Sequence, residues 1–93
     1  MRDRVTVGTT ETQIAPAAED NSGVMRNLSN VIVKNMSSTV CYLQWTNESN
    51  SLTSSNGFPL GQNEGVAIER EWGGAPIIGI TASGSAIIAV SGD

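Results

Sequence analysis

The sequence VIVKNMSSTVCYLQW (residues 31–45) decides the fold class of this chain. Residues 31–33 are a compact β-branched run, and residues 35–38 interrupt that run with turn-forming side chains. Residues 40–45 form a second extended run, in which three alternate side chains share one face suited to a core: Cys41, Leu43 and Trp45. Because only about four turn residues separate the two runs, we predict an antiparallel β-hairpin over this stretch.

Shorter extended runs, separated by turn residues, occupy much of the remaining chain. They cover residues 4–8, 12–15, 66–71, 77–82 and 85–91. Within residues 66–71 we expect Val66 and Ile68 to face the core. The 93 residues therefore predict one all-β domain, a small antiparallel β-sandwich of jelly-roll-like or Ig-like topology with about seven short strands. We expect residues 1–15 to be either an extended N-terminal arm or the first strands, and residues 16–93 to form the sandwich body.

The last two runs flank Ser83-Gly84, a two-residue connection that is typical of a tight hairpin. Both runs are apolar on both faces: Ile78 and Ile80 alternate with Ile77, and Ile87 alternates with Ile88 and Val90. In an isolated antiparallel sandwich, one face of each strand should be polar. We therefore predict that a second chain covers this region, in a homo-oligomer or at a docking surface.

Exposed apolar side chains in the extended runs and loops are the candidate interface residues. The set is Val5, Val7, Ile14, Phe58, Trp72, Ile78, Ile80 and Ile87. The first three belong to the segment that, as an arm, could add to the sheet of another chain. Phe58 lies in the irregular stretch 47–63, and Trp72 precedes Gly73-Gly74, where it is either core rim or an interface anchor.

Side chains for catalysis are few. The chain has no histidine, which removes the commonest general base and the commonest metal ligand. Cys41 has no cationic neighbour in sequence that would stabilise a thiolate, so we expect a buried core thiol. Glu69 and Glu71 share one strand face and could bind a metal or act as acid and base, but we favour a solvated outer face, which also protects an edge strand from aggregation. We therefore predict no enzyme activity, no catalytic or metal site and no cofactor.

Charge and hydropathy exclude further classes of function. The net charge is −4, and no basic stripe is present, so we expect no nucleic-acid binding. The longest apolar stretch is short and interrupted by Gly and Ser, so we expect no membrane span. A single cysteine and an N-terminus without an apolar run predict synthesis in a reducing cytoplasm rather than secretion.

The order of these segments resembles a group of small virion proteins of tailed bacteriophages. Its members have a VTV-x-T-x-T-x-I-A-P strand pair, a V-I-V-K-N-x-S-S-x-x-V-Y-L hairpin, an S-N-G-F-P-L loop, a G-E-x-x-x-I strand and a closing hairpin around Ser-Gly. The corresponding segments here are residues 5–16, 31–43, 55–60, 64–68 and 77–90. The chain departs from this pattern at residues 69–72, which are more charged and aromatic than expected.

The resemblance implies a capsid decoration (cement) protein or head-fibre base, without catalytic residues to transfer. Such a protein binds the major capsid protein on the outer surface of the shell, as a trimer or a dimer, with the trimer favoured here. The expected location is the virion, after synthesis in the cytoplasm of the bacterial host. An alternative is a tail-fibre or receptor-binding module that recognises host glycans through Tyr42, Trp72 and the amide-rich stretch 47–63.

Overall fold

The computed structural model describes residues 2–16, 30–46, 51–70 and 75–92. These residues form eight β-strands: β1 (Arg2–Val7), β2 (Thr12–Ala15), β3 (Asn30–Asn35), β4 (Cys41–Gln44), β5 (Phe58–Leu60), β6 (Gly65–Glu69), β7 (Ile77–Thr81) and β8 (Ala86–Gly92). No helix occurs among the described residues. The predicted all-β sandwich is confirmed.

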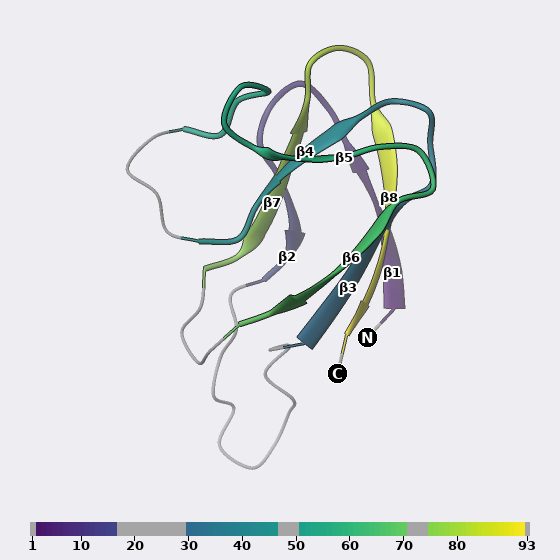
Figure 1. Ribbon diagram of the computed structural model, residues 1–93, viewed down its shortest axis with the longest axis vertical. Helices are drawn as coiled ribbons and strands as arrows, with labels where there is room; N and C mark the ends of the chain where they lie inside the picture. Colours follow the sequence, from purple (N-terminus) through teal and green to yellow (C-terminus); the bar gives the residue numbers. More distant parts are fainter. Residues whose placement is uncertain (1, 17–29, 47–50, 71–74, 93) are drawn as a thin grey trace.

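Two four-stranded antiparallel sheets pack face to face (Figure 1). Sheet A has the order β1-β8-β3-β6, and sheet B has the order β2-β7-β4-β5. The pairs are nested: β1 pairs with β8, β2 with β7, β3 with β6 and β4 with β5. This is the strand order of an eight-stranded jelly roll, and it differs from the order of an Ig domain.

Neither predicted hairpin forms. β3 belongs to sheet A and β4 to sheet B, and likewise β7 belongs to sheet B and β8 to sheet A. Each short connection therefore crosses between the sheets instead of joining paired neighbours. Gly84, with a φ of 72°, turns the chain at the second of these crossings. The prediction was wrong because a short polar connection is compatible with both a hairpin and a crossing between two sheets.

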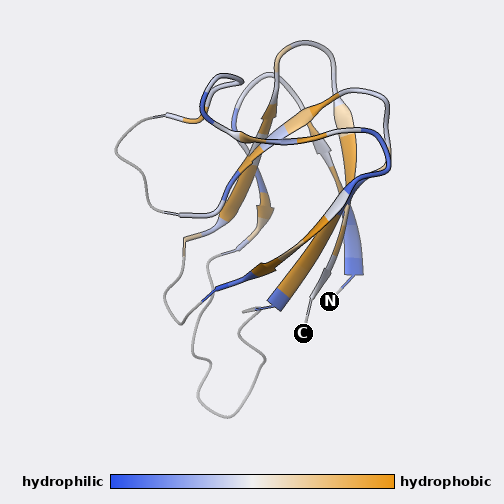
Figure 2. Ribbon diagram, viewed as in Figure 1, coloured by the Kyte–Doolittle hydropathy of each residue, from blue (hydrophilic) through white to orange (hydrophobic). Residues whose placement is uncertain are grey.

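The core lies between the sheets. It is filled by the inward-facing side chains, which alternate along each strand with outward-facing ones. Its largest fully buried apolar side chains come from both sheets: Val7, Val31, Val33, Ile88 and Val90 from sheet A, and Cys41, Leu43, Leu60 and Ile77 from sheet B. The predicted inward faces of residues 40–45 and 66–71 are confirmed, because Ile68 is also buried and Trp45 and Val66 pack against the cluster. In Figure 2 much of β3 and of β7 is coloured as hydrophobic. Burial of each large aliphatic side chain contributes about 1.5–3 kcal/mol.

Asn35 is a fully buried polar residue that ties the two sheets together. Its Nδ2 donates to the carbonyl oxygens of Thr39 at 2.7 Å and of Leu60, in β5, at 2.8 Å. Its Oδ1 accepts hydrogen bonds from the backbone N–H and the hydroxyl of Ser37, at 2.9 and 2.8 Å. All its side-chain hydrogen-bonding capacity is therefore used where the chain leaves sheet A for sheet B.

Residues 2–15 are the first strands of the two sheets. β1 pairs along its whole length with β8, from Arg2 opposite Ser91 to Val7 opposite Ala86. β2 pairs with β7, with an irregularity in the register between Gln13 and Ala15. The pairing of Arg2 with Ser91 also places the two ends of the described chain side by side (Figure 1).

Candidate functional site

The candidate interface residues do not form one surface. Val7 and Ile14 lie in the core, at 0% and 3% exposure, so the prediction that they contact a partner is corrected. They are buried because each faces the opposite sheet. Val5 is half-buried and packs against the same core, and Trp72 lies outside the described residues.

The remaining candidates point outward from opposite sides of the sandwich. Ile78 and Ile80 are half-buried on the outer face of sheet B, whereas Ile87 is 43% exposed on the outer face of sheet A. The apolar region at residues 77–91 is therefore two patches, one on each outer face, and not a single strand pair that needs one covering chain.

An aromatic cleft opens at the edge of sheet B. Trp45 follows β4 and meets Phe58 of β5 edge-to-face, with ring centroids 5.4 Å apart. The cleft has a volume of about 510 Å³, and its lining includes the polar side chains of Gln44, Thr46 and Asn56. Aromatic faces beside amide and hydroxyl groups can bind a ligand that is apolar on one side and hydrogen-bonding on the other.

The loop of residues 51–57 shapes one wall of this aromatic cleft. Asn56 holds the loop together, since its Oδ1 accepts from the Thr53 N–H at 2.8 Å and its Nδ2 donates to the Ser51 carbonyl at 3.0 Å. A Cβ at Gly57 would lie only 2.7 Å from the Cβ of Tyr42, so only glycine permits the loop to approach β4 this closely.

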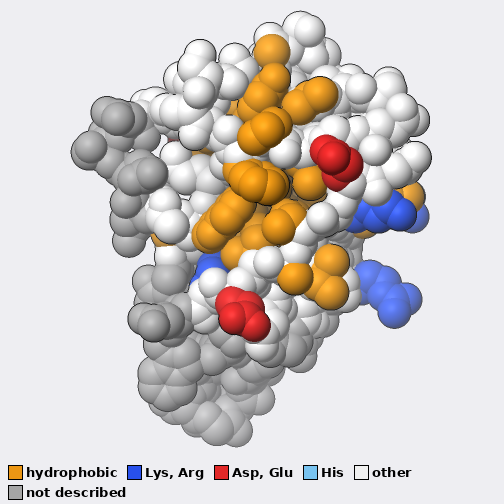
Figure 3. All heavy atoms as spheres, viewed as in Figure 1, with side chains coloured by type: hydrophobic (Ala, Val, Ile, Leu, Met, Phe, Trp, Pro, Cys, Tyr) orange, Lys and Arg blue, Asp and Glu red, His pale blue; other side chains and the backbone are white. Residues whose placement is uncertain are grey.

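An apolar strip is visible in the space-filling view, from the top of the molecule toward its middle (Figure 3). Acidic side chains lie to the right of the strip and below it in this view, and most of the visible cationic side chains lie to its right (Figure 3). Apolar and charged side chains are thus segregated on this side.

A groove of about 590 Å³ lies on the outer face of sheet A. Cationic side chains line it from two strands that flank β8: Arg2 and Arg4 from β1, and Lys34 from β3. Its floor includes Ala89 and Ser91 of β8. Their short side chains leave an open space between the longer side chains of β1 and β3. The sequence did not single out these cations, because their proximity depends on the pairing of β8 with both β1 and β3. Only the spacing of Arg2 and Arg4, two residues apart on one strand, was visible beforehand.

Reactive groups are sparse in the described part of the chain. Cys41 is buried, and desolvation raises the pKa of its thiol to about 11, partly offset by a backbone hydrogen bond from Ile80. The described residues contain no group of three His, Cys, Asp or Glu side chains that could hold a metal ion. Glu69 is exposed on β6, and Glu71, its predicted partner, falls outside the described residues.

Arg70, which follows Glu69 in the sequence, is buried. Its guanidinium donates to the carbonyl oxygens of Pro16, at 2.7 Å, and of Ala75, at 2.9 Å. Burial lowers the pKa of this guanidinium. The contacts connect segments 54 residues apart in sequence, so Arg70 acts as a structural tie.

No stretch of the described residues forms a helix that is long and apolar enough to cross a membrane. Comparison with models of known protein families, with curated proteins and with solved structures found no match to this chain. The fold and the two outer faces are therefore the basis for assigning a function.

Proposed function

We propose that this chain is a bacteriophage capsid decoration protein that binds the outer surface of the major capsid shell and stabilises it. The observation that carries the proposal is a compact jelly roll with apolar side chains on both outer faces. The order of its sequence motifs, which resembles small phage virion proteins, supplies the identity of the partner. Its location is then the virion surface, after synthesis in the bacterial cytoplasm.

The exposed apolar residues of sheet A support a protein partner. Ile32 is 57% exposed on β3, and at the other end of that strand Met36 and Ile87 are 40% and 43% exposed. The Met36 N–H donates to the Ile87 carbonyl at 2.8 Å, so these two residues are neighbours. Scattered apolar residues are ordinary on a surface, but several on one sheet face favour burial against another protein.

The half-buried Ile78 and Ile80 on sheet B support self-association. With one apolar patch on each outer face, a chain can use one face for copies of itself and the other for the shell. A homotrimer, in which each copy contributes the same sheet B patch around a closed ring, uses this division.

The test uses virions of a tailed phage from which the gene for this chain has been deleted. We expect the purified chain to bind these particles saturably, to appear as density on the shell by electron microscopy, and to raise the temperature at which the shell releases DNA. Density only at the tail tip, or no binding to the particle, would contradict a decoration role.

The aromatic cleft favours a second function, that of a receptor-binding module for host surface glycans. Trp45 and Phe58 offer ring surfaces, and Gln44 and Asn56 offer amide groups at the same place. Sugars present apolar C–H faces and many hydroxyl groups, which match this combination. A glycan array read with the labelled chain tests it: selective binding that Trp45→Ala abolishes supports this function, and an array without selective signals excludes it.

A further inference from the structure

The groove on sheet A owes its shape to the register of three strands. Arg4 lies opposite Ala89, and Ala89 in turn lies opposite Lys34. One step along, Arg2 lies opposite Ser91, which lies opposite Ile32. Directly opposed residues in a sheet project from the same face. The small side chains of β8 are therefore flanked on both sides by long ones, and the hollow runs along β8.

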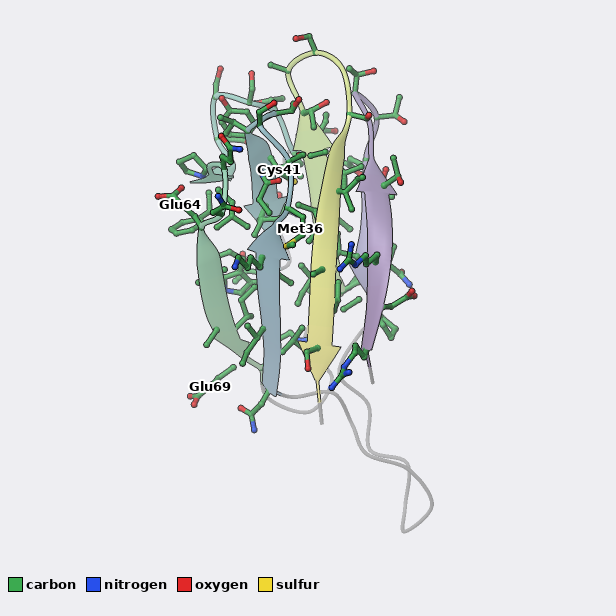
Figure 4. All side chains as sticks on the ribbon, turned by 90° about the vertical axis from the view of Figure 1, so that its right-hand side faces the viewer. Met36, Cys41, Glu64 and Glu69 are labelled. Atoms are coloured by element: carbon green, nitrogen blue, oxygen red, sulfur yellow. The ribbon has the colours of Figure 1, made fainter. Side chains whose placement is uncertain are left out.

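The positive charge of the groove contrasts with the rest of the molecule. The chain as a whole carries a net charge of −4, yet every exposed lysine or arginine among the described residues lines this groove. The fourth described cation, Arg70, is buried elsewhere. On the same sheet, Glu64 and Glu69 lie toward the opposite edge, at β6, as Figure 4 shows. Within the described residues, no carboxylate forms an ion pair with the three groove cations.

We propose that this groove binds an acidic, extended segment of a partner protein. β1 and β3 are two strand spacings apart, roughly 10 Å, which leaves room for one extended chain above β8. Arg2 and Arg4 project at an interval of roughly 7 Å, the repeat of every second residue in an extended chain. Carboxylates at alternate positions of the segment therefore meet the two guanidinium groups, which can bind carboxylates with two hydrogen bonds each.

The other side of the groove completes the recognition. Lys34 lies across from Arg4 and attracts a further carboxylate, while Ile32 lies across from Arg2 and offers an apolar contact. A segment in which acidic and apolar side chains alternate satisfies both. The short side chains of the floor allow its backbone to approach β8 closely.

An acidic polypeptide fits this groove better than a nucleic acid does. Three cations are too few to follow a phosphate backbone. Ile32 gives the groove an apolar wall that a phosphate chain does not need.

A second copy of this chain fits less well because most of its described acidic groups are engaged. Of the four described acids, Asp3 accepts from the Arg4 N–H, Glu11 from the Leu52 N–H and Glu64 from the Gly61 N–H. Only Glu69 has no such backbone hydrogen bond to another described residue. The described surface of a second copy therefore offers few free carboxylates, which favours a different protein as the source of the segment.

This inference rests on the proposed role of the chain as a surface-binding module, and it names the chemistry of the partner segment. The test measures binding of a fluorescent seven-residue peptide, in which three glutamates alternate with valines, to the full chain by anisotropy at low and moderate salt. We expect saturable binding that weakens as salt increases. The same peptide with glutamine in place of glutamate should bind at least tenfold more weakly.

Two variants separate the groove from the overall charge. Arg4→Gln with Lys34→Gln should weaken peptide binding at least tenfold. Gln13→Glu with Thr10→Glu changes the net charge by the same amount at exposed positions on or beside sheet B, and should change binding less than twofold. Ala89→Phe keeps every charge but fills the floor, and it should block the peptide while the melting temperature shows that the chain remains folded.

Three results would overturn the inference: no saturable binding of the glutamate peptide, equal weakening by both charge pairs, or tighter binding of a single-stranded DNA oligonucleotide of the same charge. A fourth such result can come from the oligomeric state of the wild type and of the Arg4→Gln, Lys34→Gln variant, measured by analytical sedimentation. If only the variant loses self-association, the occupant is a second copy and the inference is wrong. If the peptide fails but the chain still decorates virions, the inference fails and the proposed function stands.

Discussion

The two sheets bury similar side chains but present different side chains to solvent. The difference is clearest in the strand that lies second in the order of each sheet. In sheet A this strand is β8. Its outward residues Ala89 and Ser91, unlike Ile87 near its other end, are small and leave a groove between neighbouring cations. In sheet B it is β7, whose outward residues Ile78 and Ile80 are large and fill the equivalent space. The inward face of a strand determines how the jelly roll packs, whereas the outward face is free to acquire a binding function.

Removal of residues 1–15 would have the largest effect on this arrangement. The deletion takes an edge strand from each sheet, together with the buried Val7 and Ile14, so we expect loss of the cooperative fold. Circular dichroism and amide NMR dispersion are the measurements. A native-like spectrum from the shortened chain would instead mean that the segment is a separable arm, as one reading of the sequence allows.

Substitution of Asn35 would uncouple the sheets without removing a strand. Asn35→Leu leaves the carbonyls of Thr39 and Leu60 and the N–H of Ser37 without their partner. We expect the free energy of unfolding to fall by roughly 3 kcal/mol, measured by urea denaturation. Asn56→Ala is the matched control, because Asn56 makes comparable hydrogen bonds at an exposed turn. An equal loss of unfolding free energy in both variants would show that the burial of Asn35 between the sheets does not increase the contribution of its hydrogen bonds to stability.

The buried thiol of Cys41 makes the stability of the core depend on pH. Burial raises the pKa of its thiol from 9.0 to about 11, so the folded chain retains a proton that the unfolded chain releases. Stability from this group is therefore fully present below pH 9 and is lost as the pH rises toward 11. Denaturation at several pH values should show this decline in the wild type and a smaller decline in Cys41→Ala. A thiol reagent at pH 8 should label the unfolded chain much faster than the folded one.

Phe58 tests the outer edge of sheet B. Because Phe58 is 45% exposed and contacts Trp45 edge-to-face, Phe58→Ala should lower the free energy of unfolding by only about 1 kcal/mol. The stronger effect should be on ligand binding in the aromatic cleft, measured by intrinsic tryptophan fluorescence during glycan titration. Val40→Ala, at an apolar site of 37% exposure, is the control and should leave the titration unchanged.

Ile32 on sheet A should have the smallest effect on stability. At 57% exposure, Ile32→Ser is expected to change the free energy of unfolding by less than about 0.5 kcal/mol. The same variant should bind deletion-mutant virions more weakly, which a sedimentation assay measures. A loss of stability above about 1.5 kcal/mol would indicate that Ile32 packs within the fold instead of facing a partner.

Sequence alternation alone predicted the inward faces. Cys41, Leu43 and Ile68 are buried as expected, because a period of two along a strand does not depend on which strand lies beside it. Pairing could not be predicted in the same way, since the runs at residues 31–45 and 77–91 cross between sheets. The aromatic cleft and the cationic groove both depend on these pairings, and so they became visible only in three dimensions.

Asn35 illustrates a second limit of the sequence. It stands in an Asn-Met-Ser-Ser run that indicates an exposed turn, yet it is fully buried. Its burial depends on the Leu60 carbonyl, 25 residues away, which no local pattern reveals. A polar side chain can be a core residue when the turn that contains it crosses the interior between two sheets.

The nested pairing of strands has a consequence for biosynthesis. Chains emerge from the ribosome N-terminus first, at about 5–20 residues per second. β8 is the last of the eight strands to emerge, yet it lies between β1 and β3 and pairs with both. Until it arrives, β1 has no partner in its own sheet, and β3 has only β6. Sheet A is therefore completed only after translation has passed residue 92, and until then two strand edges remain open to chaperones or to other nascent chains.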